Sequence, residues 1–309
     1  MSSPLVVSVC EEYLADALGA LAPDVEVVRW DLAGPAPRER IDLVVPGYLM
    51  ERARLAHLAG VRTRLVQSQS IGFDGIAEVL PPGVVYANAA SVHETSTAEL
   101  AVALTLAAQR GLPDFVRAAQ RGAWSFAFHE SLADRTVLLV GYGGVGRAIA
   151  ARLLPCEVNL VRVARRARRV DDVEVHAWGE LSTLLPRADI VVVSLPLTAE
   201  TTRLVDATFL SRMKDHTLLV NVGRGPVVDT DAVVAEASSG RLRFALDVVD
   251  PEPLPAESPL WDAPGVTIAP HVGGANDSAP VRYDRLIGAQ LAHLAAGEPY
   301  ENIVWGPLA

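Results

Sequence analysis

Three ionisable side chains in the second half of the chain stand where chemistry is possible: Arg224, Glu252 and His271. Arg224 lies between two glycines at the end of an apolar run, where its guanidinium could bind a carboxylate through two parallel hydrogen bonds. Glu252 lies between two prolines, which restrict the backbone and would fix the direction of the carboxylate. His271 lies between Pro270 and Val272-Gly-Gly274, on a tight loop that a substrate could approach.

A histidine paired with a carboxylate is suited to proton transfer. The carboxylate fixes the tautomer, raises the pKa of the imidazole and stabilises the imidazolium. Taken singly, each residue has a plainer interpretation: Arg224 as a structural arginine, Glu252 as an exposed turn residue and His271 as a structural histidine. The residue types alone leave these alternatives open.

A glycine-rich turn, Gly141-Tyr-Gly-Gly-Val-Gly146, is a candidate for binding phosphate groups. An apolar run precedes it and a helical pattern follows it, which is the context of a dinucleotide-binding fingerprint. Gly141 permits the sharp turn, Gly143 lets the backbone approach a pyrophosphate, and Gly146 lets the helix pack closely on the strand. The phosphates would then lie at a helix N-terminus. The alternative is a glycine-rich hairpin that binds nothing.

Composition limits the class of protein. The 309 residues suggest about two domains, and a net charge of −10 argues against nucleic acid as the main partner. The two cysteines, Cys10 and Cys156, form neither a disulfide framework nor a zinc site, and no other metal-ligand cluster is visible, so we expect no metal and a cytoplasmic location. The N-terminus does not resemble a signal peptide, and no apolar run approaches the ~20 residues of a membrane span.

Two successive α/β units are predicted to position these residues. In the first, apolar runs indicate strands at 5–9, 25–30, 43–45, 65–67 and 84–86, with helical patterns at 11–21 and 51–58. A long helix is expected over 95–109, with Ser96 and Glu99 spaced as a capping box, and a more polar helix over 114–121. An irregular aromatic segment, 124–129, follows.

The second unit repeats the alternation. Strands are predicted at 137–140, 158–163, 190–195, 217–222, 244–248 and 266–269, and helices at 145–154, 181–185 and 230–238. A last helix covers 279–296. Continuous apolar runs are typical of strands buried on both faces, so both sheets are expected to be parallel.

Five ordered motifs carry a family resemblance over essentially the whole chain. They are the glycine turn 141–146, Ser194-Leu-Pro-Leu-Thr198, Asn221-Val-Gly-Arg-Gly225, Leu246-Asp-Val-Val-Asp-Pro-Glu-Pro253 and Pro270-His-Val-Gly-Gly274. Together they resemble the D-isomer-specific 2-hydroxyacid dehydrogenases. The resemblance implies an α/β fold with two doubly wound parallel-sheet domains: a Rossmann dinucleotide-binding domain, 94–276, inserted into a flavodoxin-like substrate-binding domain, 1–93 and 277–309.

The resemblance also implies roles for individual residues. Arg224 is similar to the arginine that binds the substrate carboxylate, Glu252 to the glutamate that orients the histidine, and His271 to the proton donor and acceptor. Ser70-Ile71-Gly72 aligns with the loop whose backbone amides hold the substrate, and Asp247 with the aspartate that binds the nicotinamide amide. The remaining cofactor-binding positions implied are Gly141, Gly143, Gly144, Val145, Gly146, Leu195, Pro196, Val222 and Gly274.

The implied activity is hydride transfer between a nicotinamide cofactor and a small 2-oxoacid or D-2-hydroxyacid, of the glyoxylate or hydroxypyruvate reductase type. Two alternatives stay open: a phosphoglycerate dehydrogenase-like enzyme, and a corepressor-like protein that senses nucleotide. The resemblance, with the apolar helix 95–109, also predicts a homodimer. The aromatic residues Trp124, Phe126 and Phe128 would then reach a partner's cleft or, more plainly, pack in the core.

The end of the second strand of the nucleotide unit departs from an NAD site. Relatives that prefer NAD carry an acidic residue there, which binds the ribose hydroxyls. In this chain the position is Ala164, and Arg165, Arg166, Arg168 and Arg169 follow it. An absent acid with adjacent arginines favours a 2′-phosphate, so NADP(H) is predicted over NAD(H), with Arg165 and Arg166 as its ligands. A solvated basic turn is the alternative.

Overall fold

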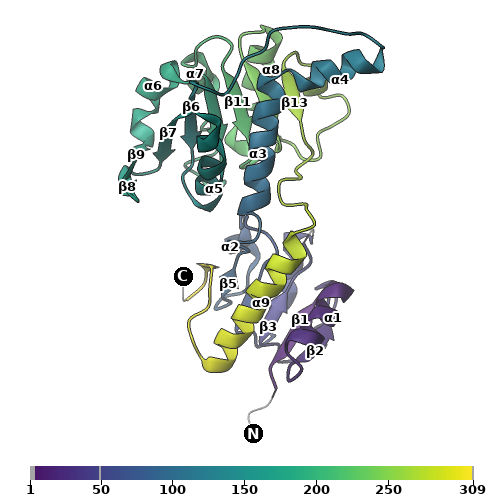
Figure 1. Cartoon of the computed structure of the whole chain (residues 1–309). Coiled ribbons are helices and arrows are strands. Elements are labelled where there is room, and N and C mark those ends of the chain that lie inside the picture. The colour runs from purple at the N-terminus through teal and green to yellow at the C-terminus, as the bar shows by residue number, and fades with distance from the viewer. Residues whose placement is uncertain (1–3, 49, 308–309) are drawn as a thin grey trace. The chain divides into compact units, whose positions relative to one another are not determined.

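The computed structural model describes residues 4–48 and 50–307. The chain forms two compact units, residues 1–93 with 277–309 and residues 94–276 (Figure 1). No helix within the described ranges is both long enough and apolar enough to cross a membrane.

The first unit is built on a six-stranded sheet with the order β14-β5-β4-β3-β1-β2. Its strands are β1 (Val6–Val9), β2 (Glu26–Arg29), β3 (Leu43–Val45), β4 (Leu65–Gln67), β5 (Tyr86–Ala87) and β14 (Ile303–Trp305). Its helices are α1 (Glu12–Leu21), the 3₁₀ helix η1 (Arg52–Leu58), α2 (Ile76–Val79) and α9 (Ala279–Ala296). The first five strands are parallel in the order 2-1-3-4-5 of flavodoxin-like folds, as predicted.

Helices cover both faces of this sheet. On β1, Val7 and Val9 pack with α1 and α9, whereas Val6 packs with η1 and α2 on the opposite face. This arrangement follows from the period of two in side-chain direction along a strand, which requires apolar residues at consecutive positions when both faces are buried.

The second unit contains an eight-stranded sheet with the order β13-β12-β11-β10-β6-β7-β9-β8. Its strands are β6 (Thr136–Val140), β7 (Asn159–Ala164), β8 (Arg168–Val170), β9 (Val173–Ala177), β10 (Ile190–Val193), β11 (Leu218–Asn221), β12 (Arg243–Leu246) and β13 (Val266–Ile268). Its helices are α3 (Glu94–Gln109), α4 (Leu112–Gln120), α5 (Gly144–Leu153), α6 (Leu181–Leu184), α7 (Ala207–Ser211) and α8 (Thr230–Ser238). Apart from β8, the strand order is that of a Rossmann sheet. The chain adds β7 and β9 on one side of β6 and then β10 to β13 on the other, so the strand order reverses between β6 and β10.

Two helical layers enclose the second sheet. Val137 and Leu139 of β6 contact the layer of α3 and α5, whereas Leu138 and Val140 contact the layer of α6, α7 and α8 (Figure 1). All four side chains are at most 1% exposed, so the apolar run that precedes the glycine turn is a fully buried strand.

Three local predictions were wrong. Both sheets are mixed, because β14 runs antiparallel to β5 and β8 runs antiparallel to β9. Both antiparallel strands are three-residue edge strands, which need no long crossover connection and leave little apolar pattern in the sequence. Ser96 is not a helix N-cap either, because α3 begins two residues earlier, at Glu94.

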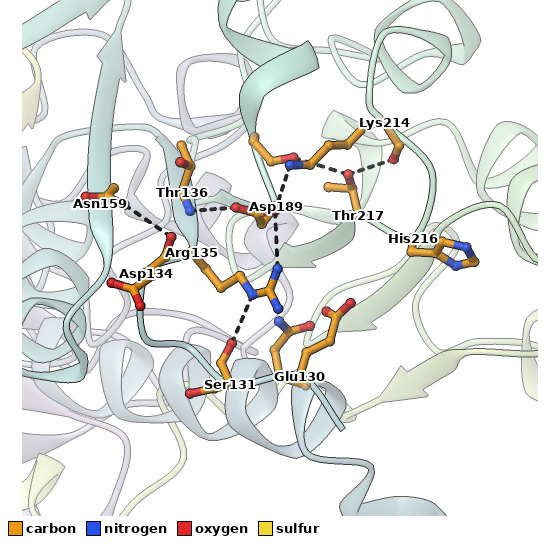
Figure 2. A network of polar contacts seen from close by, with 12 residues as sticks. Glu130, Ser131, Asp134, Arg135, Thr136, Asn159, Asp189, Lys214, His216 and Thr217 are labelled. Atoms are coloured by element: carbon orange, nitrogen blue, oxygen red, sulfur yellow. Dashed lines mark hydrogen bonds and ion pairs between the residues drawn. The ribbon is translucent and has the colours of Figure 1, made fainter. Parts of the chain in front are cut away.

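A charged network joins the amino-terminal ends of the strands in the second unit. Asp189, which precedes β10, accepts hydrogen bonds from the Thr136 N–H and from the Lys214 ammonium, and Arg135 lies 3.8 Å away (Figure 2). Burial acts to raise the pKa of Asp189, but these donors outweigh it and leave the pKa lowered. The network therefore stabilises the edge of the sheet opposite to the glycine turn.

Candidate active site

The carboxyl-terminal edge of the second sheet gathers most of the predicted residues. The turns that follow β6, β10, β11, β12 and β13 carry, in that order, the glycine motif, Leu195, Arg224, Glu252 and His271. These strands are neighbours and parallel, so the loops at their carboxyl ends lie side by side. Ligands of open α/β sheets bind at this edge.

His271 and Glu252 form a direct pair. Nδ1 of His271 lies 2.8 Å from Oε2 of Glu252, and the backbone N–H of Val249 donates to Oε1 at 3.0 Å. The backbone of His271 is in the left-handed region, with φ of 53°. Its N–H donates to the carbonyl oxygen of Asp247 at 2.8 Å. The loop thus holds a strained backbone so that the ring faces the carboxylate.

The pair changes the proton affinity of both groups. The hydrogen bond to Glu252 raises the pKa of His271, although burial and the charge of Arg224 oppose the change. For Glu252, burial acts to raise the pKa, but the hydrogen bonds from His271 and Val249 outweigh it and leave the pKa lowered. A carboxylate beside an imidazolium is therefore favoured over a wide range of pH. The side chain of His271 remains 49% exposed, so its other nitrogen is open to a ligand.

Asp247 fixes the loop that carries the histidine. Its side chain is buried, and its two oxygens accept the N–H groups of Val272 at 2.8 Å and Gly273 at 3.0 Å. Burial raises its pKa despite these two bonds. Each carboxylate oxygen can accept a second hydrogen bond, so binding of a cofactor amide is compatible with this arrangement.

The loop with Arg224 is packed between its neighbours. A Cβ on Gly223 would lie 2.5 Å from the carbonyl oxygen of Leu195, and a Cβ on Gly225 would collide with that of Val249. The amide of Asn221 closes the loop by accepting from the Gly223 N–H and donating to the Arg224 carbonyl. The two glycines are therefore needed for close packing. Arg224, Glu252 and His271 follow three adjacent parallel strands, β11, β12 and β13, and the charge of Arg224 acts on both members of the pair.

The glycine turn has the geometry that its sequence predicts. Gly141 has φ of 109°, and a Cβ there would lie 2.7 Å from the carbonyl oxygen of Ser194. A Cβ on Gly146 would collide with the carbonyl oxygen of Gly141, whereas one on Gly143 would meet nothing within 4 Å. Gly144 and Val145 form the first turn of α5, whose leading N–H groups have no acceptor within the helix. The turn therefore leaves open space at Gly143, next to the N-terminus of α5, which suits a pyrophosphate.

The arginines after β7 lie in different surroundings. Ala164, the last residue of β7, is buried, and Arg165 and Arg166 are exposed directly after it. The guanidinium of Arg165 is 3.4 Å from Glu200, in a pair whose side chains are about 60% exposed. Such a pair is weak and would open readily for a stronger anion.

Arg168 was not among the predicted site residues. Its guanidinium reaches from β8 back to the carbonyl oxygen of Tyr142 at 2.9 Å, inside the glycine turn. The sequence placed Arg168 in a run of four arginines, and nothing in that run distinguishes the one that folds back. Ser194 was missed too, and its hydroxyl donates to the Gly141 carbonyl at 3.0 Å.

The remaining cofactor positions lie along the same edge. Leu195 and Val222 are buried at the ends of β10 and β11, Pro196 is exposed after Leu195, and Gly274 is half-buried after His271. In the part of the chain that the structure describes, no group of three or more His, Cys, Asp or Glu side chains could hold a metal ion.

The predicted substrate loop belongs to the first unit, after β4. The N–H of Gly72 donates to Oγ of Ser70 at 3.2 Å, and the side chain of Asn88 donates to the Ile71 carbonyl at 2.8 Å. The peptide groups of this loop are thus held by neighbours in their own unit. Its role in binding a substrate remains a prediction.

Comparison with known proteins agrees with this geometry. The family model described as D-isomer specific 2-hydroxyacid dehydrogenase, NAD binding domain, matches residues 102–273. The glyoxylate reductase/hydroxypyruvate reductase of Mus musculus is 33% identical over 274 residues, which cover 83% of this chain and 84% of that protein.

Solved structures are similar over nearly the whole chain. A D-isomer specific 2-hydroxyacid dehydrogenase from Xanthobacter autotrophicus Py2, in complex with NADPH and MES, is 27% identical with a TM-score of 0.84, covering 99% of each chain. An NADPH-dependent glyoxylate/hydroxypyruvate reductase from Sinorhizobium meliloti, in complex with NADP and sulfate, is 25% identical with a TM-score of 0.84, covering 98% of each chain.

Proposed function

The chain belongs to the D-isomer-specific 2-hydroxyacid dehydrogenase family, and from this premise we propose that it reduces small 2-oxoacids, glyoxylate and hydroxypyruvate foremost, with NADPH. The observation that carries the proposal is the His271–Glu252 pair, with Arg224 after the adjacent strand β11 and the glycine turn on the same sheet edge. The relatives named above as glyoxylate/hydroxypyruvate reductases support the choice of substrate.

The dinucleotide would be held by residues of the second unit. The N–H groups at the start of α5 would bind the pyrophosphate, and the open space at Gly143 would let it approach. Leu195, Pro196, Val222 and Gly274 would line the path toward Asp247, with Asp247 accepting from the nicotinamide amide. When bound, the reduced nicotinamide supplies a hydride to the carbonyl carbon of the substrate.

The protein's own residues would do the rest of the reaction. Arg224 would bind the substrate carboxylate with its planar fork and polarise the adjacent carbonyl oxygen. We also propose the backbone amides of Ser70, Ile71 and Gly72, in the first unit, as ligands of a substrate carboxylate. His271 would donate a proton to the carbonyl oxygen as negative charge develops there, and Glu252 would stabilise the imidazolium before transfer. The product is a 2-hydroxyacid, and the neutral His271 regains its proton from solvent.

NADPH preference rests on Ala164, Arg165 and Arg166. No carboxylate stands at the end of β7 to bind a ribose hydroxyl or repel a phosphate, and two exposed guanidinium groups follow at once. Two of the similar solved structures contain NADPH or NADP, which agrees with this choice.

The proposed assembly is a homodimer. Trp124, Phe126 and Phe128 are 97%, 77% and 93% exposed, so their packing in the core of their own chain is excluded. Large aromatic side chains so exposed and so close in sequence are typical of a surface that another molecule covers. We propose that a second copy covers them. Sedimentation of the protein at micromolar concentration should show a dimer, and a monomer would refute this part of the proposal.

The test of activity is the oxidation of NADPH by the purified protein in the presence of glyoxylate or hydroxypyruvate. We expect turnover with both substrates, and a loss of roughly 10²–10⁴ in kcat for His271→Ala with cofactor affinity retained. Cofactor binding without turnover in the wild type would favour the nucleotide-sensing alternative. Near-normal turnover in the variant would show that His271 is not the proton donor.

A further inference from the structure

The carboxyl-terminal edge of the first sheet holds a carboxylate that the proposed reaction does not use. Glu11 lies two residues after the end of β1, and its Oε1 accepts the backbone N–H of Tyr48 at 3.2 Å. Tyr48 lies on the loop that follows β3, so the side chain of Glu11 connects the loops of two adjacent strands. A Cβ on Gly47 would lie 3.4 Å from Oε1, which shows how closely the loop after β3 packs on this carboxylate.

The third loop in contact with Glu11 is the one that leads into Ser70-Ile71-Gly72. The side-chain amide of Gln69 donates to Oε1 and Oε2 of Glu11 at 3.0 and 2.9 Å and to the Pro46 carbonyl at 2.9 Å. Gln69 is 7% exposed, and its own carbonyl oxygen lies 2.7 Å from Nε2 of His93. Its amide therefore holds Glu11 in place beside the residue that begins the substrate loop.

The charge of Glu11 is not neutralised by these contacts, because its partners are amide groups. Burial first and the Glu11 charge second raise the pKa of both the Cys10 thiol and the Tyr13 hydroxyl. The other charged groups that act on these two residues are Asp31, Asp284, Arg29 and Arg54, and Arg54 lies 3.6 Å from Asp31. Around Cys10 and Tyr13 the three carboxylates Glu11, Asp31 and Asp284 therefore outnumber two guanidinium groups, so the local field is negative.

We infer that Glu11 is a specificity-determining residue that excludes 2-oxoacids with a second negative charge. The inference rests on the proposed function and deepens it. Strands β4, β3 and β1 are adjacent and about 4.8 Å apart, so the loop of Glu11 lies two strands from the predicted substrate loop. A substrate held there by its carboxylate would carry a terminal phosphate or second carboxylate into this field. At a separation of two strand spacings, about 10 Å, repulsion between a half-exposed carboxylate and the two charges of a phosphate ester weakens binding roughly tenfold.

A negative field at this position favours 2-oxoacids whose remaining part is uncharged or very small. Glyoxylate has no tail, and the hydroxyl of hydroxypyruvate can donate a hydrogen bond to a carboxylate. The phosphate ester of hydroxypyruvate cannot, and it brings two further charges. The same residue therefore argues against the phosphoglycerate dehydrogenase-like alternative.

The experiment compares kcat/KM for hydroxypyruvate and for its phosphate ester. We expect Glu11→Gln to raise the ratio of ester to hydroxypyruvate about tenfold. Glu11→Asp keeps the charge but shortens the side chain, so the ratio should stay near the wild-type value. Glu12→Gln removes a neighbouring charge from the exposed first residue of α1 and should leave both substrates unchanged.

A measurement on the wild type makes the test independent of the folding of any variant. If the field repels the ester, higher ionic strength should raise the kcat/KM for the ester relative to that for hydroxypyruvate. If the site instead attracts the ester, higher ionic strength should lower this ratio. The inference alone would be overturned if this kcat/KM ratio falls with salt. It would also be overturned if Glu11→Gln still reduces hydroxypyruvate but leaves the ratio within twofold of the wild-type value. A wild type that reduces neither substrate would overturn the proposed function and this inference with it.

Discussion

Oε2 of Glu252 lies 2.8 Å from Nδ1 of His271, while Oε1 of the same carboxylate accepts the N–H of Val249. Both oxygens are therefore engaged, and the carboxylate cannot rotate away from the ring without losing two hydrogen bonds. Because Nδ1 faces Glu252, the nitrogen that would exchange a proton with the substrate in the proposed reaction is Nε2. Glu252 would then act by orienting the imidazole ring.

Replacement of Glu252 by Gln should shift the pH dependence of the reaction. Reduction needs a protonated His271, so in the wild type its rate falls as the pH rises through the raised pKa of this residue. Without the carboxylate the pKa is lower, and the fall should begin at a lower pH. The rise of the reverse oxidation, which needs neutral His271, should move in the same direction. Profiles of kcat/KM against pH in both directions measure the shift, and superimposable wild-type and variant profiles would contradict the pairing.

Arg224→Lys tests whether geometry or charge matters at this position. A lysine keeps the positive charge but cannot reproduce two parallel hydrogen bonds to a carboxylate. We expect a loss of roughly ten- to hundredfold in kcat/KM, corresponding to one lost charge-assisted hydrogen bond, with effects on both KM and kcat. Thermal unfolding should change little, because Arg224 is only half-buried. Kinetics equal to those of the wild type would mean that the residue is structural.

The parts of the fold that were predicted from sequence are those in which neighbouring residues determine the structure. The apolar run of β6 is buried on both faces, Gly141 has the positive φ that the sharp turn requires, and Gly141 and Gly146 pack closely as their spacing predicts. Helices α8 and α9 begin and end at the predicted residues because their periodic patterns have clear limits. Segments such as β14 escaped notice because pairing with β5 joins residues more than 200 positions apart in the chain.

In the site, too, features set by neighbouring residues could be predicted, whereas contacts between distant parts of the chain could not. The pairing of His271 with Glu252 was implied by the family resemblance, and the structure confirms the contact. The loop sequences alone, with prolines and glycines beside each residue, had left plainer interpretations open. The contact of Arg168 with the Tyr142 carbonyl depends on the β8–β9 hairpin, which returns the chain toward the glycine turn. The exposure of Trp124 was likewise unpredictable, because an aromatic side chain in an irregular segment carries no periodic signal.

Alanine at Gly143 and at Gly146 should have opposite consequences. A Cβ at Gly146 collides with the Gly141 carbonyl oxygen, so Gly146→Ala should destabilise the second unit by about 2 kcal/mol or more. A Cβ at Gly143 meets nothing, so Gly143→Ala should unfold at the wild-type temperature. The added methyl group would nevertheless occupy the space proposed for the pyrophosphate and weaken the binding of NADPH and NADH. Thermal unfolding and cofactor titration measure the two effects, and wild-type cofactor affinity in Gly143→Ala would contradict the proposed site.

Arg168→Ala should weaken the binding of NADH and of NADPH to the same extent. Its bond to the Tyr142 carbonyl positions the turn that would bind the pyrophosphate, a group common to NADH and NADPH. Loss of one such bond, about 1 kcal/mol, predicts a rise of roughly fivefold in the Kd of each. Arg169→Ala is the matched control, because Arg169 donates instead to the Asp172 carbonyl within its own hairpin and should change neither constant. A loss confined to NADPH would show that Arg168 binds the 2′-phosphate directly.

The choice between cofactors should depend on Ala164 and Arg165. One charge-assisted hydrogen bond from Arg165 to the 2′-phosphate predicts that NADPH exceeds NADH by roughly ten- to hundredfold in kcat/KM. Arg165 must give up its exposed pair with Glu200, which costs little. Arg165→Ala should therefore raise the KM for NADPH and barely change that for NADH, with Arg166→Ala having the smaller effect of a second ligand.

Ala164→Asp tests the same preference by introducing the acidic residue that an NAD site carries. A carboxylate at the end of β7 would repel the 2′-phosphate and accept hydrogen bonds from the ribose hydroxyls of NADH, so the preference should move toward NADH. Because Ala164 is 7% exposed, the variant must first be shown by thermal unfolding to be folded. Steady-state kinetics with both cofactors in the three variants then measure the preference. A wild type that uses NADH as well as NADPH would mean that these arginines only form a solvated surface.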